Sequence, residues 1–267
     1  MEDSQEVLEP NKDPKTEKPK PKKKKWPWVL LIILAIILIP VLFLGYLGFV
    51  PGLSGLLGAN KPVDLGVKYT TADFEAYKTK TGVIFADFNT APASPINPTK
   101  KTIFANPKDV TTSVSQSEIT AAINNLNWAL KPINNAQVRF GDNNKIEISG
   151  NLNLGVISGF TSFIGGVGYS QSDVSKAVDY GKKLVGNAPI YIDATGSVNN
   201  NQLTLNVNSV KIGRYTAPNS IAQKVLSTGT QNAINRTAGL NAKTVTVTSG
   251  NINFDGTLPT TVYVKSN

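Results

Sequence analysis

The sequence of 267 residues contains no cysteine and no histidine. Without cysteine the chain forms no disulfide bond and offers no thiolate nucleophile, and without histidine it lacks the usual imidazole base. The same two absences remove the commonest protein ligands of zinc, copper and haem. We therefore expect no metal and no other cofactor, and we expect a packed core alone to hold the folded part together.

Complete catalytic signatures are also missing. Lys80-Thr81-Gly82 matches the third motif of serine penicillin-binding proteins and β-lactamases, but no serine is followed by lysine three residues later and Ser-Asp-Asn does not occur. The tripeptide is typical instead of a helix C-terminus. Four acidic residues stand at turns or polar strand positions, where we interpret them as surface groups rather than paired glycosidase carboxylates: Asp142, Glu147, Asp193 and Asp255. The chain is predicted not to be an enzyme.

One long apolar segment is present. From Trp28 to Phe49 the chain carries no charge over 22 residues, of which sixteen are Leu, Ile, Val or Phe. At about −0.3 to −0.6 kcal/mol each, these residues favour insertion into a bilayer by roughly 5 to 10 kcal/mol. Pro40 is tolerated in a spanning helix. The sequence therefore predicts a single-pass transmembrane helix over residues 26–50.

The residues before this segment predict its orientation. Lysines cluster directly in front of it, at Lys20 and Lys22 to Lys25. Positive flanks stay in the cytoplasm, so we expect residues 1–25 to be a disordered basic cytoplasmic tail and everything after the helix to be exported. The alternative is a cleaved signal peptide, whose apolar region is normally about 7 to 15 residues. The longer segment here favours an uncleaved anchor in a bacterial cell membrane.

The net charge indicates which kinds of binding partner to expect. The formal net charge is +9, and the first 25 residues contain eight Lys against six Asp or Glu, which leaves +7 for the rest. A basic exported domain suits anionic lipid headgroups or acidic wall polymers, although simple solubility explains it equally well. We expect no nucleic-acid partner, because most of this charge is predicted to lie outside the cell.

The exported part begins with a linker and an irregular stretch. Residues 51–62 predict a juxtamembrane linker, and residues 63–267 predict one α+β domain. Within it, Thr70–Asp73 is a capping box for a short helix that Gly82 closes. Several prolines between Phe85 and Asp109 predict a long surface excursion with at most an edge strand, so residues 63–110 are expected to be irregular.

The remainder alternates between helical and strand patterns. Ser115–Glu118 is a second capping box, followed by an apolar helical stripe that we expect to continue until Pro132. Period-two alternation then predicts three hairpins, whose turns are 141–144, 199–201 and 249–251. Pro218 opens another helix. This order predicts an antiparallel sheet with helices packed on one face.

The segment from Val156 to Val167 combines a helical apolar stripe with glycines that oppose a rigid helix. It is either an ordinary core helix or a pliable flap over a cavity or membrane. In the flap alternative its ligand-binding residues are Phe160, Phe163, Ile164 and Val167. A phosphate headgroup would then meet three lysines of the following helical stripe: Lys176, Lys182 and Lys183.

These patterns resemble a known family. The chain resembles YpmS-like bacterial membrane proteins in its anchor and in four later segments. These are the Ser-x-x-Glu-Ile-x-x-x-Ile-Asn helix over 115–130, the strand ending in Ile148-Ser149-Gly150, Pro189–Ile192, and the strand 203–212 before Gly213-Arg214. They are also similar to LmeA-like phospholipid-binding domains of the tubular lipid-binding type. The resemblance covers about residues 113–259. It implies a helix packed in a curled antiparallel sheet around an apolar groove for acyl chains.

The function predicted from the sequence is therefore a membrane-anchored, non-catalytic domain that binds, shuttles or senses lipid at the cell envelope. Membrane lipid is the expected partner. The alternative is a structural module that meets another envelope protein through a sheet edge or the proline-rich loop. Hydrolysis of a wall polymer is disfavoured, since the usual nucleophiles and bases are absent.

Overall fold

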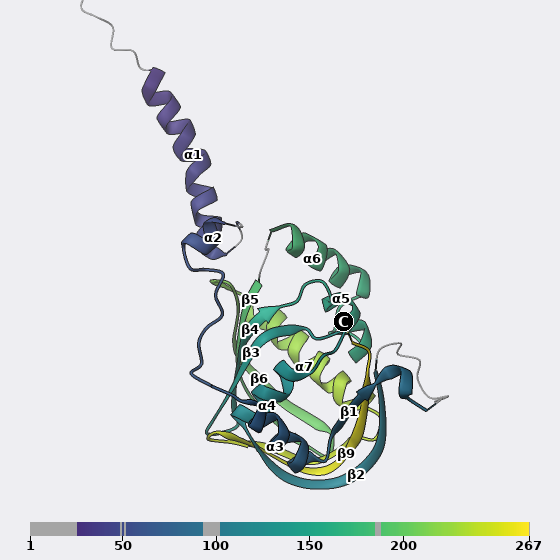
Figure 1. Cartoon of the computed structure of the whole chain (residues 1–267). Helices are drawn as coiled ribbons and strands as arrows, with labels where there is room; N and C mark the ends of the chain where they lie inside the picture. The colour runs from purple at the N-terminus through teal and green to yellow at the C-terminus, as the bar shows by residue number, and fades with distance from the viewer. Residues whose placement is uncertain (1–25, 49, 51, 93–101, 185–187, 267) are drawn as a thin grey trace, which may run out of the picture. The chain divides into compact units, whose positions relative to one another are not determined.

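A computed structural model of the chain describes residues 26–48, 50, 52–92, 102–184 and 188–266 (Figure 1). The predicted cytoplasmic tail, residues 1–25, lies outside them. The chain divides into two compact units, Met1–Pro40 and Val41–Asn267. We describe each unit by itself.

The first unit contains most of helix α1, which extends over Trp26–Leu47 and ends in the second unit. Large apolar side chains of this helix are exposed, among them Leu34, Ile36 to Ile39 and Val41 to Leu44. A helix with the length and apolar content needed to cross a bilayer is not found among the residues that the structure describes.

The second unit is an α+β fold, as the sequence predicts. In the described residues its sheet has nine strands: β1 (Ile84–Asp87), β2 (Thr102–Ser115), β3 (Ile133–Gly141), β4 (Lys145–Leu152), β5 (Ala188–Asn199), β6 (Gln202–Ile212), β7 (Tyr215–Thr216), β8 (Asn241–Thr248) and β9 (Asn251–Val264). The helices of this unit are α2 (Leu53–Leu56), α3 (Thr71–Thr81), α4 (Gln116–Asn125), α5 (Ile157–Ile164), α6 (Gln171–Leu184) and α7 (Asn219–Arg236), with a 3₁₀ turn at Phe88–Thr90.

The sheet branches at β5. Along one edge β5 pairs with β6, and along the other it pairs first with β4 and then, at Val198 and Asn199, with β8. Strand β9 continues from β8 and pairs with β2 along most of its length. The prediction of a purely antiparallel sheet is wrong, because β1 runs parallel to the last residues of β9. No short hairpin joins these two strands, so the connection does not dictate an antiparallel direction.

The three predicted hairpins are present, and asparagine determines two of their turns. Asn143 and Asn144 have φ values of 56° and 60° between β3 and β4, and Asn200 and Asn201 have 49° and 62° between β5 and β6. Two successive residues in the left-handed region produce the type I′ geometry that matches the twist of the strands, and asparagine tolerates that region better than most residues.

The two predicted capping boxes are also present, at the start of α3 and of α4. However, α4 ends at Asn125 rather than continuing to Pro132. The Asn124 side chain donates to Ala136 O at 2.8 Å and accepts from Ala136 N at 3.0 Å, so it ties the end of the helix to β3. The apolar residues Leu126 and Leu130, which the sequence placed in the helix, therefore belong to the segment that follows α4. Helix α6 is capped by Ser170, whose hydroxyl oxygen accepts from Asp173 N at 3.1 Å.

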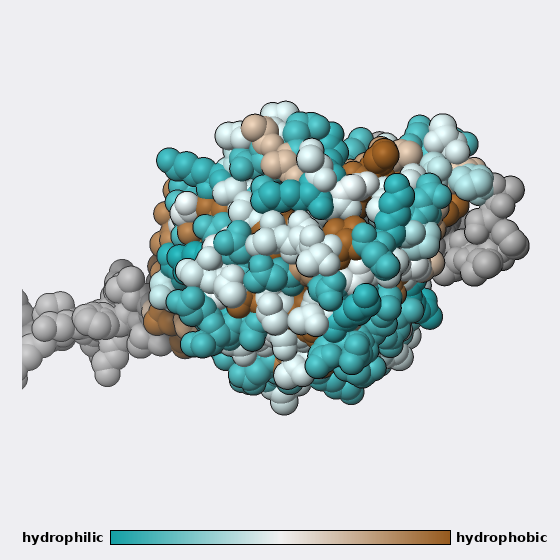
Figure 2. All heavy atoms as spheres, turned by 90° about the horizontal axis from the view of Figure 1, so that it is seen from below, coloured by the Kyte–Doolittle hydropathy of each residue, from teal (hydrophilic) through white to brown (hydrophobic). Residues whose placement is uncertain are grey.

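Helices α4 and α7 cover the inner face of the sheet (Figure 1). Two core clusters form there. The first joins Ala222 of α7 to Ile192, Ala194, Val207 and Val210, and the second joins Ile119 and Ile123 of α4 to Val138, Phe140 and Val247. The face of the molecule seen in Figure 2 is mainly hydrophilic or neutral, with hydrophobic residues in separate small areas.

The segment before α3 covers part of the other face. Leu65 and Val67 are buried, and their backbone N–H groups donate to Gln137 Oε1 on β3 at 2.8 and 3.4 Å. Residues of β3 and β4 that point away from the helices are thereby shielded, and Ser149 is only 1% exposed. This end of the sheet is consequently packed on both faces.

Candidate functional site

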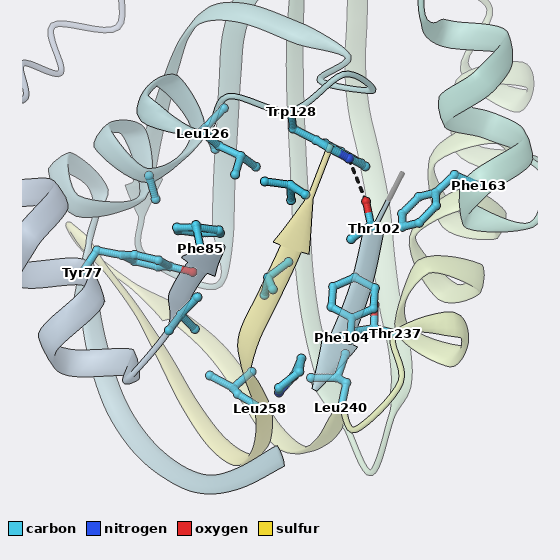
Figure 3. A pocket seen from close by; sticks show the side chains of 16 residues that line it. Tyr77, Phe85, Thr102, Phe104, Leu126, Trp128, Phe163, Thr237, Leu240 and Leu258 are labelled. Atoms are coloured by element: carbon cyan, nitrogen blue, oxygen red, sulfur yellow. Dashed lines mark hydrogen bonds between the residues drawn. The ribbon is translucent and has the colours of Figure 1, made fainter. Parts of the chain in front are cut away.

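An apolar cavity of about 370 Å³, called here the aromatic cavity, lies in the described part of the second unit (Figure 3). It lies among α3, α4, β1, β2 and β9 and reaches Phe163 near the end of α5. Its lining comprises Tyr77, Val83, Phe85, Thr102, Phe104, Ala122, Ile123, Leu126, Trp128, Phe163, Thr237, Leu240, Leu258, Pro259, Val262 and Val264. None of these residues carries a formal charge at neutral pH.

A group of aromatic rings forms one wall. The Trp128 ring lies 5.3 Å from that of Phe163 and 6.1 Å from that of Phe160, both with edge-to-face geometry. Phe104 of β2 lies 6.4 Å from Phe163. The Trp128 indole N–H donates to Thr102 Oγ1 at 2.8 Å, which fixes the orientation of the indole. Edge-to-face pairs of this kind are preferred over face-to-face stacking, so the wall is a defined structure.

The lining side chains are not sealed from solvent. Phe85, Phe104, Leu126, Trp128 and Phe163 are all partly exposed. Apolar surface that faces water costs about 25 cal/mol per Å² relative to burial. An apolar ligand that covered these side chains would recover that free energy.

The few polar groups that line the cavity are uncharged hydroxyl groups. The Thr237 hydroxyl donates to Ala233 O, and Thr102 accepts from Trp128. Burial raises the pKa of Tyr77, so this phenol stays neutral at physiological pH, and its hydroxyl points toward the cavity (Figure 3). The aromatic cavity is therefore suited to an uncharged apolar group.

A second apolar hollow of about 270 Å³ lies between α7 and the sheet. It is lined by Ile146, Ile148, Ile192, Ala194, Gly196, Ser197, Val198, Leu203, Leu205, Leu226, Thr230, Val245, Val247 and Ile252. Ile123 of the aromatic cavity and Ile252 of this second hollow both pack against the core cluster of Val138, Phe140 and Val247. That cluster therefore borders residues of both hollows, and its Val247 lines the second one.

The structure separates the four predicted flap residues into two pairs. Phe163 lines the aromatic cavity and Phe160 contacts Trp128. Ile164 and Val167 are buried, and both approach Gly229 of α7, where a Cβ atom would lie 3.4 and 3.2 Å from them. The segment thus contributes two aromatic residues to the cavity and two aliphatic residues to the core.

The glycines that follow α5 are fixed on α7. Asn232 Nδ2 donates to the carbonyl oxygens of Gly165 and Gly166 at 3.2 and 3.1 Å. A Cβ atom on Gly165, whose φ is +94°, would lie 2.4 Å from Arg236 Nε. Gly166, whose φ is +98°, has open space at its Cβ position, so the left-handed backbone rather than lack of room favours glycine there.

The three predicted headgroup lysines lie elsewhere. Lys176, Lys182 and Lys183 are exposed on α6, which contributes no residue to the lining of either hollow within the part of the chain that the structure describes. Lys182 pairs with Asp179 at 3.7 Å, and Lys183 lies 5.8 Å from the ring centre of Tyr180. The structure does not bring these lysines to the aromatic cavity.

Among the four acidic residues, the surface interpretation is wrong for Glu147, which is only 6% exposed. It accepts hydrogen bonds from Tyr191 OH at 2.6 Å and Arg139 Nε at 2.8 Å. Burial raises its pKa, but the hydrogen bonds from Tyr191 and Arg139 and the charges of Arg139 and Lys145 outweigh that effect and keep the pKa below its usual value. Burial and the bond to Glu147 raise the pKa of Tyr191. Glu147 is a satisfied member of a polar network.

Lys80–Gly82 ends α3, as predicted, with Gly82 in the left-handed region at φ 69°. Lys80 also forms an ion pair with buried Glu118 at 2.8 Å. The cavity residues Phe85, Phe104 and Trp128 were not foreseen, because two lie in the stretch expected to be irregular and the third in a predicted helix. Their aromatic character was the one available signal.

Groups of three or more acidic side chains arranged to hold a metal ion do not occur in the described residues. No protein-family model, curated protein or solved structure matches this chain. The resemblance to lipid-binding membrane proteins stays a prediction from the sequence.

Proposed function

We propose that the folded unit binds the acyl chain of a lipid in the aromatic cavity, without catalysing a reaction on it, and that residues 26–50 anchor the chain in a bacterial membrane with the folded unit outside the cytoplasm. The observation that carries the binding proposal is an uncharged cavity of about 370 Å³ whose aromatic and aliphatic walls remain partly exposed.

Size and chemistry support an acyl ligand. Binding pockets for small ligands measure about 300–1,000 Å³, and the aromatic cavity falls within this range. Each methylene transferred from water to an apolar site contributes about 0.8 kcal/mol. The engaged hydroxyls of Thr102 and Thr237 offer little to a polar ligand.

The absence of catalysis is proposed from the same lining. Acyl transfer or hydrolysis needs an activated nucleophile, a base within hydrogen-bond reach and donors for the developing negative charge. The described lining residues offer only hydroxyl groups and no carboxylate, amine or guanidinium group beside them.

The membrane anchor is proposed from the uncharged run 28–49 and its lysine flank. The exposed apolar side chains between Leu34 and Leu44 support it, since an apolar helix surface in water is unfavourable.

Trp128 supplies a direct test. The chain contains three tryptophans, so a full-length W26F/W28F variant keeps only Trp128, in the cavity wall. In lipid-free detergent, a brominated fatty acid should quench Trp128 fluorescence saturably, and an excess of unlabelled fatty acid should restore it. Quenching that rises linearly with concentration and resists competition would contradict binding.

A matched pair of variants tests whether the ligand binds in the aromatic cavity. Ala122 lines the cavity, and Ala122→Leu in the same background should occupy the space and abolish saturable quenching. Ala177 is exposed on α6, and Ala177→Leu should leave quenching unchanged. Equal quenching in both variants would move the ligand out of the aromatic cavity.

A further inference from the structure

The C-terminal end of α1 is held by the turn between β6 and β7. Arg214 N donates to Leu47 O at 3.0 Å, and its guanidinium group donates to Leu57 O at 2.8 Å and to Tyr46 O at 3.4 Å. The same guanidinium group lies 4.4 Å from the ring centre of Tyr46. One arginine thus satisfies carbonyl groups at the end of the helix and in the segment that follows it.

The neighbouring glycine makes this contact possible. Gly213 has φ +60°, and a Cβ atom there would lie 2.4 Å from Leu47 O. Its own N–H donates to Pro189 O at 2.7 Å. The turn therefore joins the end of α1 to the start of β5, so a fixed contact precedes the predicted juxtamembrane linker, residues 51–62.

The C-terminal half of α6 lies at the same end of the sheet. Leu152, the last residue of β4, pairs with Ala188, the first of β5. Gly181 of α6 approaches Leu154, with a Cβ position 3.6 Å from its side chain. Lys182 and Lys183, adjacent to Gly181, are thereby placed near the strand ends where Gly213 is bound.

This end of the folded unit is basic and carries exposed tyrosines. We call it the basic end and define it by Lys182, Lys183, Lys211, Arg214 and Tyr215. All five are exposed or partly exposed, with Tyr215 at 43%, and the adjacent Tyr180 is 67% exposed. Among the described ion pairs, Asp179 with Lys182 is the one at this end, so Lys183, Lys211 and Arg214 leave it with a net positive charge.

We infer that the basic end lies against the anionic headgroups of the bilayer in which α1 is anchored. This inference rests on the anchor part of the proposed function. The chain leaves α1 at Leu47, where Arg214 holds it, so the strand ends next to that turn lie beside the helix exit. Lysine, arginine and tyrosine are the residues that favour the headgroup region of an anionic leaflet.

The absence of cysteine makes the test unambiguous, because a single introduced cysteine is the only labelled site. Lys183→Cys places a nitroxide label on the basic end. Lys243→Cys replaces another exposed lysine at the far end of β5, where Lys243 O accepts from Asn200 N. The 12 residues of β5 separate these ends by about 37 Å, at about 3.4 Å per residue.

Full-length chains are reconstituted into phosphatidylcholine vesicles with and without phosphatidylglycerol, and a headgroup-chelated nickel lipid serves as relaxing agent. With phosphatidylglycerol, relaxation of the label at position 183 should exceed that at position 243 at least threefold. The excess should fall at least twofold without the anionic lipid. Equal relaxation at both positions, or an excess independent of lipid charge, would overturn the inference.

A second variant tests the contact with α1. Arg214→Ala should reduce the excess relaxation at position 183, whereas Lys108→Ala, on exposed β2, should not. An unchanged excess in Arg214→Ala would refute the role of the contact. Chains that fail to float with the vesicles would refute the anchor and this inference with it, whereas chains that float with equal relaxation at both positions would refute the inference alone.

Discussion

The indole N–H of Trp128 and the hydroxyl of Thr102 form a 2.8 Å hydrogen bond that joins the segment after α4 to the first residue of β2. Thr102 is only 4% exposed, so water does not readily replace it as an acceptor. The bond also fixes the ring that forms the wall of the aromatic cavity, so it connects the stability of this region to the shape of the proposed site.

Thr102→Val should therefore destabilise the protein by about 1–3 kcal/mol, because it leaves the Trp128 N–H without its acceptor. Thr111→Val is the matched control on the same strand, since Thr111 donates to Asp255 at an exposed position and its loss should cost no more than about 0.5 kcal/mol. Urea denaturation of both variants measures the difference. Equal midpoints would show that the buried bond has no special importance.

The pH dependence of stability should follow Glu147. Its pKa in the folded chain lies below the ordinary value of 4.5, so its stabilising contribution is complete above pH 4.5 and is lost as the pH falls through the folded-state pKa. The stability difference between the wild type and Glu147→Gln should be constant near neutral pH and shrink below about pH 4.5. Urea midpoints at several pH values test this.

Because the chain has no histidine, its stability at neutral pH serves as the reference for the measurements in acid. No imidazole titrates between pH 5 and 8, so stability should be nearly constant there. A difference between wild type and Glu147→Gln that grows on acidification would show that Glu147 is protonated more readily in the folded chain, against the geometry of its hydrogen bonds.

The hairpins were predictable because their signals are local. Asn143 and Asn144, like Asn200 and Asn201, adopt the left-handed backbone that a two-residue turn requires, and alternating apolar residues flank them. The capping boxes of α3 and α4 depend on residues three positions apart, so short sequences contain the necessary information.

Strand β2 shows where such signals fail. Pro107 faces Pro259 across the β2–β9 pair, and Asn106 has φ 53°. Proline offers no N–H to the ladder, so this composition is typical of a loop, and pairing with the long strand β9 stabilises the strand. The aromatic cavity was hidden for the same reason, since Phe104 belongs to β2 and meets Phe163 only through tertiary contacts.

Two glycines of the β8–β9 hairpin should respond differently to alanine. Gly250 has φ +80° with open space at its Cβ position, so Gly250→Ala should cost about 1–2 kcal/mol from backbone conformation alone. Gly256 has φ +150°, and its Cβ atom would lie 2.0 Å from Asn241 O, so Gly256→Ala should cost about 1–3 kcal/mol more. Thermal and urea unfolding of the two variants should rank them in that order. The reverse ranking would contradict the close packing of β8 against β9 beside the register shift between Ala242 and Thr244.

Adjacent residues of α5 allow the core and the cavity wall to be distinguished. Ile164 is 6% exposed and packs toward Gly229, so Ile164→Ala should destabilise the protein by about 2–5 kcal/mol while leaving saturable quenching of Trp128 intact. Phe163 is partly exposed in the aromatic cavity, so Phe163→Ala should cost less stability but weaken quenching by the brominated fatty acid, because the ligand loses an aromatic wall. Measured together, the two variants separate loss of fold from loss of binding. If Ile164→Ala instead abolished binding at a temperature where it remains folded, the division of α5 into a core face and a cavity face would be wrong.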